Sequence, residues 1–225
     1  FVFLAEILRL YPSGKLVSFE FLKSTRLYFS LIMTGLLYNF GIWIDKFIFW
    51  FNPETSHQVI GPLRGSLLYD LPIFLAYLAI IPGMAVFLVK IETDFAEWYE
   101  KLFNAVRDGG TLSYIHHARD EMTGAIREGL FAICKIQAVT IVVLLIFAPN
   151  ILDWLGISRY HLPLFYIDVV GVSIQVVFMA LLNVFFYLDK RTIVLSLCAL
   201  FVVLNAGLTL LSQQLGPLYF GYGFT

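Results

Sequence analysis

Long apolar runs separated by short polar segments dominate the pattern of this chain. Because a hydrocarbon core about 30 Å thick needs roughly 20 apolar helical residues, the pattern predicts transmembrane helices. Five runs reach or approach this length, at 28–51, 66–89, 129–148, 164–188 and 193–211. Residues 1–10 look like the end of a preceding helix, and residues 218–225 like the start of a further one. We expect a single all-α membrane domain, a polytopic bundle of about five full and two partial helices, that is a piece of a larger protein.

The longest polar stretch, residues 90–128, also has helical periodicity. Phe95 and Trp98 begin an apolar stripe beside acidic and basic residues, and Gly109 lies in a break between two such segments. We predict two amphipathic cytoplasmic helices that lie along the membrane face. Trp98 and Tyr99 are expected to be exposed there and to form a docking surface for a partner.

Composition agrees with a membrane protein. Hydrophobic residues make up 60% of the chain and charged residues 14%, with a mean hydropathy of +0.82, whereas soluble domains carry about 25% charged residues. A net charge of −1 offers no electrostatic basis for binding nucleic acid. Cys134 and Cys198 both lie in apolar runs, so neither a disulfide framework nor a cysteine zinc site is expected.

The distribution of basic residues predicts the orientation, because Lys and Arg accumulate in cytoplasmic loops. Segments between the predicted helices alternate, with twelve of the 15 Lys and Arg residues on one side. The other side has Lys46, Arg64 and Arg159. The side with the segment before the first full helix and with the long linker is therefore predicted to be cytoplasmic.

Asp45 and Lys46 are adjacent in the outer third of the first predicted full helix. Neighbouring helical residues point about 100° apart, so we expect that the two side chains do not easily pair with each other. In one interpretation they reach the interface beside Trp43 and Trp50, where aromatic residues are typical. In the other they line a functional polar cavity.

Two further acids favour the cavity. Asp70 and Asp168 lie near the outer ends of the second and fourth predicted helices, at a depth similar to that of Asp45. Lys46 is predicted to pair with Asp70, because consecutive helices joined by a short loop usually pack together. Two further polar residues are expected to extend the substrate or ion pathway inward, namely Asn39 and Gln175.

Pro72 and Pro82 both interrupt the second predicted helix. Each proline removes a backbone hydrogen bond, which a bilayer tolerates only where protein or water compensates. The pair indicates either a packed static kink or a hinge.

The linker also contains two His–acid pairs at i, i+4 spacing, His116 with Asp120 and His117 with Glu121. This spacing suits a metal, but no third strong ligand is near, so solvated pairs are predicted and no metal site. No Walker pattern or GxGxxG occurs, and no cofactor is expected.

A family resemblance becomes visible from the first full helix onward. The strings "YNFGIWIDKFIFWF", "PETSHQVIGPLRGSLLYDLPIFLAYLAIIPGMAVFLVKIETDFAEWYEKLF" and "LNVFFYLDKR" resemble the PelG family, inner-membrane transporters of the Pel exopolysaccharide machinery within the MATE-like, Wzx-type MOP flippase superfamily. The resemblance extends over essentially the whole chain. It implies a twelve-helix protein of which this chain spans the end of the sixth helix to the start of the twelfth, and it carries no catalytic signature.

The resemblance further implies a non-enzymatic, multi-pass exporter of the bacterial inner membrane that moves a cationic, partly deacetylated amino-sugar polymer into the biofilm matrix. Implied partners are a cytoplasmic glycosyltransferase, membrane subunits that sense cyclic di-GMP, and membrane lipid. Two alternatives stay open from the sequence, a MATE-like small-molecule antiporter and a membrane-embedded sugar transferase or polymerase.

Overall fold

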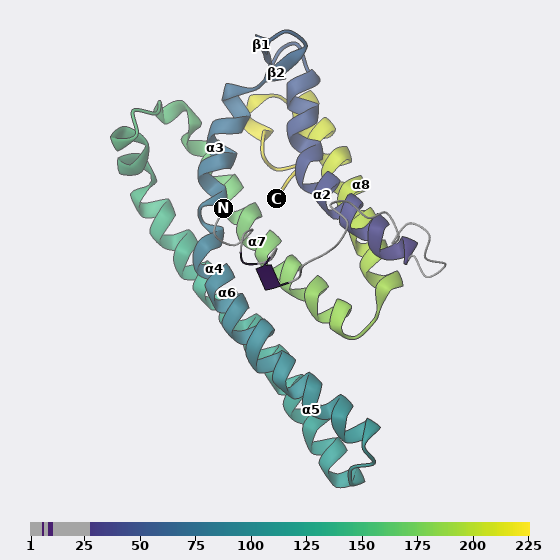
Figure 1. Cartoon of the computed structure of the whole chain (residues 1–225). Helices are drawn as coiled ribbons and strands as arrows, with labels where there is room; N and C mark the ends of the chain where they lie inside the picture. Colours follow the sequence, from purple (N-terminus) through teal and green to yellow (C-terminus); the bar gives the residue numbers. More distant parts are fainter. Residues whose placement is uncertain (1–5, 7–8, 11–27) are drawn as a thin grey trace.

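The computed structural model describes residues 6, 9–10 and 28–225, and most of the helix end predicted at residues 1–10 lies outside this part (Figure 1). The elements in chain order are α2 (Phe29–Phe51), β1 (His57–Ile60), β2 (Leu63–Gly65), α3 (Leu67–Tyr77), α4 (Ile80–Val89), the π-helix η2 (Lys90–Phe95), α5 (Ala96–Arg107), α6 (Leu112–Trp154), η3 (Arg159–His161), α7 (Leu162–Tyr187), α8 (Arg191–Leu215) and η4 (Pro217–Tyr219). Five helical stretches in the described residues are long and apolar enough to cross a membrane. This confirms the prediction of an all-α polytopic bundle.

The helices pack as two groups. Helix α2 lies against α8, whereas α7 contacts α3, α4 and α6 (Figure 1). A buried apolar cluster that includes Phe49, Tyr69 and Phe165 joins the ends of α2, α3 and α7. The polar residues considered below lie beside this cluster.

The second span is interrupted between α3 and α4. Backbone hydrogen bonds at the junction join residues three positions apart, where an α-helix joins residues four apart. They run from Leu78 N–H to the Leu75 carbonyl and from Ile81 N–H to the Leu78 carbonyl. Pro82 follows, and its ring lacks an N–H and clashes with the carbonyl four residues earlier. Pro72, in contrast, lies inside the continuous helix α3.

The linker at residues 90–128 differs from its prediction. Instead of two separate helices along the membrane face, α5 continues the second span through η2, and its partner is the first part of the 43-residue helix α6. At 1.5 Å per residue α6 is about 64 Å long, twice the hydrocarbon thickness. The apolar stripe that suggests a membrane surface in the sequence is instead covered by the facing helix, where Ile91, Phe95 and Met122 belong to one buried cluster.

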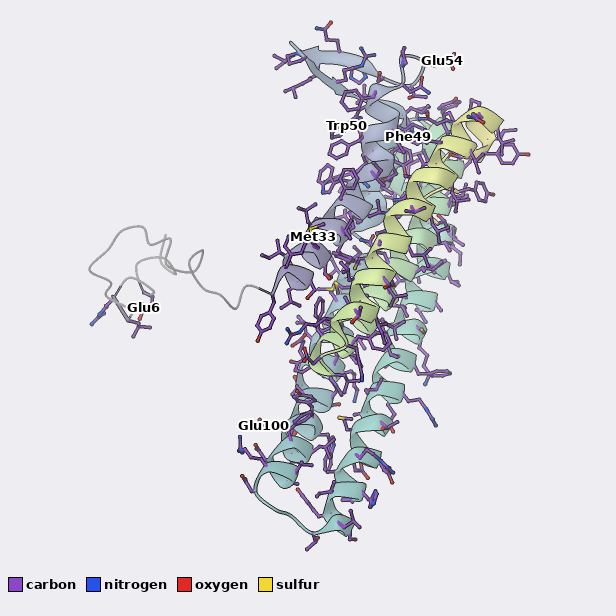
Figure 2. The ribbon with its side chains drawn as sticks, turned by 90° about the vertical axis from the view of Figure 1, so that its right-hand side faces the viewer. Glu6, Met33, Phe49, Trp50, Glu54 and Glu100 are labelled. Atoms are coloured by element: carbon purple, nitrogen blue, oxygen red, sulfur yellow. The ribbon has the colours of Figure 1, made fainter. Side chains whose placement is uncertain are left out.

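The bundle has two distinct ends, which Glu54 and Glu100 mark in Figure 2. The β1–β2 hairpin, the loop at 155–161 and η4 lie at one end, and the tip of the α5–α6 hairpin lies at the other (Figure 1). Connections therefore alternate between the ends, as the predicted topology requires.

The final segment is also different from its prediction. Where a further helix is predicted from Leu218, the structure has η4 followed by turns. Gly216, with φ of 102°, and Pro217 end α8, because the proline cannot continue the hydrogen-bond ladder. The chain then enters the bundle, where Phe220 and Phe224 are each 7% exposed.

Candidate functional site: a buried ionic cluster

Helices α2, α3 and α7 bring five polar side chains together. We call them the ionic cluster, and its members are Asp45, Lys46, Tyr69, Tyr77 and Asp168. Asp45 and Asp168 are fully buried and Lys46 is 6% exposed. The two charges of α2 are therefore not interfacial anchors in this structure.

Asp45 and Lys46 form a salt bridge, with 3.1 Å between Lys46 Nζ and Asp45 Oδ2. The expectation that they do not pair is wrong, because the long lysine side chain bends around the helix. Its Nζ also donates to the Ile42 carbonyl at 2.8 Å, one turn back on the same helix. A hydrophobic helix thus satisfies a buried cation largely from its own residues.

Two tyrosines from α3 complete the pair. Tyr69 Oη donates to Asp45 Oδ2 at 2.6 Å, and Lys46 Nζ donates to Tyr77 Oη at 3.2 Å. Rings also surround the ammonium, with the Tyr77 centroid at 5.1 Å and the Phe224 centroid at 5.3 Å. Sequence reasoning missed both tyrosines, although their spacing of eight residues places them on similar faces of a helix and was a usable signal.

Asp168 of α7 is buried without a hydrogen bond. Neither carboxylate oxygen has a partner within the described part of the chain. Asp45 and Lys46 are close enough to interact with it electrostatically. Depth of burial was not readable from the sequence, which placed Asp168 near the interface.

Asp70 has a different role from the predicted one. It accepts from Trp50 Nε1 at 2.9 Å and from the Ser66 backbone N–H at 2.9 Å, and no salt bridge joins it to Lys46 within the described residues. The predicted Lys46–Asp70 pair is wrong, because Asp70 faces the start of its own helix. Both residues nevertheless line one groove of about 580 Å³ between α2 and α3, beside Trp43 and Trp50.

The predicted inward extension is not continuous with the cluster. Asn39 is exposed and donates to the Gly35 carbonyl of its own helix at 2.8 Å. Gln175 is 8% exposed and lines a separate cavity of about 280 Å³, on which Asn205 of α8 also borders. Asn205 was missed by sequence reasoning, and its Nδ2 joins α8 to α2 by donating to the Gly41 carbonyl at 2.8 Å.

A second polar contact lies where the second span leaves the bundle. Glu92, in the π-helix η2, accepts from Asn183 Nδ2 at 2.8 Å and from Tyr187 Oη at 3.2 Å. The partners come from the end of α7. Since the sequence places Glu92 in an exposed linker, only packing reveals this contact.

Trp98 and Tyr99 are not the exposed surface that the sequence predicts. Both are half-buried against the core of the α5–α6 hairpin, and the Tyr99 ring lies 5.3 Å from that of Tyr187. The exposed apolar side chains of α5 are Phe103 and Val106, at 52% and 59%.

The histidines of α6 lie on an exposed surface. His117 Nδ1 is 3.9 Å from Glu121 Oε1. Among residues 6, 9–10 and 28–225, no group of three or more His, Cys, Asp or Glu side chains is placed to hold a metal ion.

Comparison with known proteins identifies a family. The model of the family described as "PelG: Putative exopolysaccharide Exporter (EPS-E)" matches residues 1–225. No curated protein and no solved structure matches the chain.

Proposed function

Because the chain belongs to the PelG family of exopolysaccharide exporters, we propose that it moves a sugar polymer across a bacterial inner membrane and that the ionic cluster takes part in this transport. The observation that carries the second half of the proposal is the burial of two acids and one base inside membrane-spanning helices. Charged side chains there are costly and mark substrate or ion pathways.

The composition of the cluster supports transport over a purely structural role. A buried ion pair contributes little net stability, since desolvation offsets the attraction between the charges. Tyr69 and Tyr77 add hydrogen bonds that reduce this cost, but Asp168 receives none in the described residues. A site that only held helices together would not need a third ionisable group.

The groove between α2 and α3 is the proposed contact surface for the polymer. It is lined by Trp43, Trp50 and Tyr77, with Asp70 and Lys46 beside them. Aromatic faces attract the ammonium groups of amino sugars, and the carboxylate of Asp70 supplies a negative charge. A cationic, partly deacetylated polymer of a biofilm matrix, which the family resemblance implies, suits this lining.

The proposed partners are a cytoplasmic glycosyltransferase that delivers the polymer and membrane subunits that sense cyclic di-GMP. Support comes from the α5–α6 hairpin, whose helix α6 is long enough to reach well beyond a bilayer. Phe103 and Val106 give the hairpin an exposed apolar surface.

The test is secretion by cells whose own copy is deleted and replaced by variants. Asp168→Asn, and Asp45→Asn combined with Lys46→Met, should lower secreted polymer strongly while the amount of protein in the membrane stays unchanged. Glu54→Gln is the matched control, because Glu54 is exposed at the β-hairpin end. Normal secretion by both cluster variants would remove the cluster from the transport pathway, and secretion without the chain would contradict export itself.

A further inference from the structure

The carboxyl group of Asp168 poses an electrostatic problem. It is 0% exposed, and neither oxygen has a hydrogen-bond partner in the described chain. An isolated ionised carboxylate in such an environment is so unfavourable that the group normally takes up a proton or a counter-ion. The question is which of the two the surroundings can supply.

Helix α2 presents the charged neighbours, and they are already engaged. An ammonium group has three donors, and those of Lys46 point to the Ile42 carbonyl, the Asp45 carboxylate and Tyr77 Oη. Lys46 therefore has no donor left for Asp168. Asp45 is itself a like charge.

Within the described residues, the other elements around Asp168 bring no counter-charge. Helix α3 contributes the phenols of Tyr69 and Tyr77, and α6 contributes apolar residues such as Ala148 to the adjoining core. His161, just before α7, is seven residues and about 10 Å away. The final segment faces the carboxyl with Gly221, where an added Cβ would lie 3.1 Å from Asp168 Oδ1.

We infer that Asp168 holds a proton in this conformation and that this proton is the ion coupled to polymer export, an inference that rests on the proposed function. A hydronium ion transfers the proton to one carboxylate oxygen and becomes water, and no bond between heavy atoms forms or breaks. The proton arrives from water on one side of the membrane and returns to water on the other. When Asp168 is neutral, the charges of Asp45 and Lys46 cancel, and the ionic cluster has no net charge.

A metal cation is a poor alternative here. Hard cations need several oxygen ligands around one point, whereas the Asp45 oxygens are already bonded to Lys46 and Tyr69. A proton needs only one oxygen.

The final segment controls water access to this carboxyl. A groove of about 230 Å³ at the β-hairpin end is lined by His161, Leu164, Ile167 and Phe220, among others. Gly221 lies between this groove and the carboxyl, since its added Cβ would meet both Leu164 Cδ1 at 2.5 Å and Asp168 Oδ1. Its φ of 89° also favours glycine. Displacement of this segment would hydrate Asp168 and release the proton.

Infrared difference spectroscopy on the full-length protein in lipid bilayers tests the inference. A band from a protonated carboxyl should be present at neutral pH and should be lost in Asp168→Asn, an isosteric change. It should persist in Asp153→Asn and Glu54→Gln, two exposed acids at the same end. Gly221→Ala, which displaces the covering segment, should weaken the band.

Three results would overturn the inference: absence of the band from the natural protein, its survival in Asp168→Asn, or its disappearance when sodium is added at constant pH. The last would make sodium the ligand. Secretion is measured separately in the deletion strain. If the band is missing but secretion still requires this protein, only the inference about the proton is rejected. If secretion does not require this protein, the proposed export function is rejected.

Discussion

At the residue scale, the ammonium group of Lys46 connects the ionic cluster, because it donates to a carbonyl, a carboxylate and a phenol at once. Its partners come from two helices, so its charge couples the positions of α2 and α3. Removing one member of a buried ion pair costs about 3–5 kcal/mol, since the other charge is left uncompensated.

Lys46→Met should therefore destabilise the protein by about 3–5 kcal/mol, and adding Asp45→Asn should recover most of the loss. The free energy of unfolding in mixed detergent micelles measures both effects. Asp70→Asn added to Lys46→Met should recover nothing, because Asp70 binds Trp50 and Ser66 instead. If Asp70→Asn did recover stability, the result would support the Lys46–Asp70 pair that the sequence alone suggests.

Trp50 supports the groove wall through its bond to Asp70. Trp50→Phe keeps an aromatic ring but removes the donor, and the loss of a hydrogen bond to a charged group should cost about 1.5 kcal/mol in unfolding free energy. Trp154→Phe is the matched control, since Trp154 is 86% exposed at the end of α6. Equal effects of the two substitutions would contradict a role for the indole N–H.

At the element scale, the interruption between α3 and α4 divides the second span into two rigid pieces. The piece before it carries Tyr69 and Tyr77 of the ionic cluster, and the piece after it runs into η2 and Glu92. A change of angle at Leu78 and Ala79 would move the cluster relative to the Glu92 contact. The interruption is thus a candidate hinge, whereas Pro72 in α3 belongs to one rigid piece.

Pro82→Ala should join α3 and α4, because alanine restores the missing N–H and removes the clash with the Leu78 carbonyl. We expect export to fall while the unfolding free energy stays the same or rises. Secretion and micelle unfolding measure the two properties. If the joined helix exports normally, the interruption is a packed kink.

The α5–α6 hairpin is the proposed docking element. Phe103→Ser with Val106→Ser should weaken co-purification of the cytoplasmic glycosyltransferase without changing stability, because both side chains are exposed. Trp98→Ala with Tyr99→Ala should instead lower the unfolding free energy, since these rings pack in the hairpin core. If the double serine variant co-purifies as much glycosyltransferase as the natural protein, Phe103 and Val106 do not form the docking surface.

At the scale of the whole molecule, the two ends of the bundle carry different charges. Arg64 and Arg159 are the basic residues of the β-hairpin end, whereas the segment from η2 through α6 and the turn from α7 into the start of α8 carry eight. Because basic residues are retained in the cytoplasm, the end of the bundle with the α5–α6 hairpin is predicted to be cytoplasmic. The groove at 155–161 then opens outward.

Cysteine labelling in intact cells tests this orientation, in a background that lacks Cys134 and Cys198. Ser158→Cys should react with an impermeant reagent, because Ser158 is exposed in the 155–161 loop. Ser113→Cys, exposed near the hairpin tip, should react only after the cells are opened. The opposite pattern would place the groove beside Asp168 on the cytoplasmic side of the membrane.

Much of the architecture follows from local pattern. Runs such as 28–51 and 193–211 become α2 and α8 within a few residues of their predicted bounds, because apolar length and turn residues act on neighbouring positions. The linker and the final segment were harder. An apolar stripe is the same whether a membrane or a second helix covers it. Residues 218–220 form an apolar run that suits a helix, whereas Gly221 and Gly223 favour the turns that the structure has.

The sequence by itself determined the class of protein, its membrane-spanning segments, its family and the acids worth suspecting, because these depend on residue type and spacing. Only the tertiary structure decided that Asp45 pairs with Lys46, that Tyr69 and Tyr77 complete the pair, and that Asp168 has no partner in the described chain. Asp45 and Lys46 are neighbours in the chain, but the tyrosine contacts join residues 24 and 31 positions apart, and Asp168 comes more than 100 positions after Asp45. Their formation depends on how whole helices rotate and pack, and the energy of each charge depends on burial that no local pattern encodes.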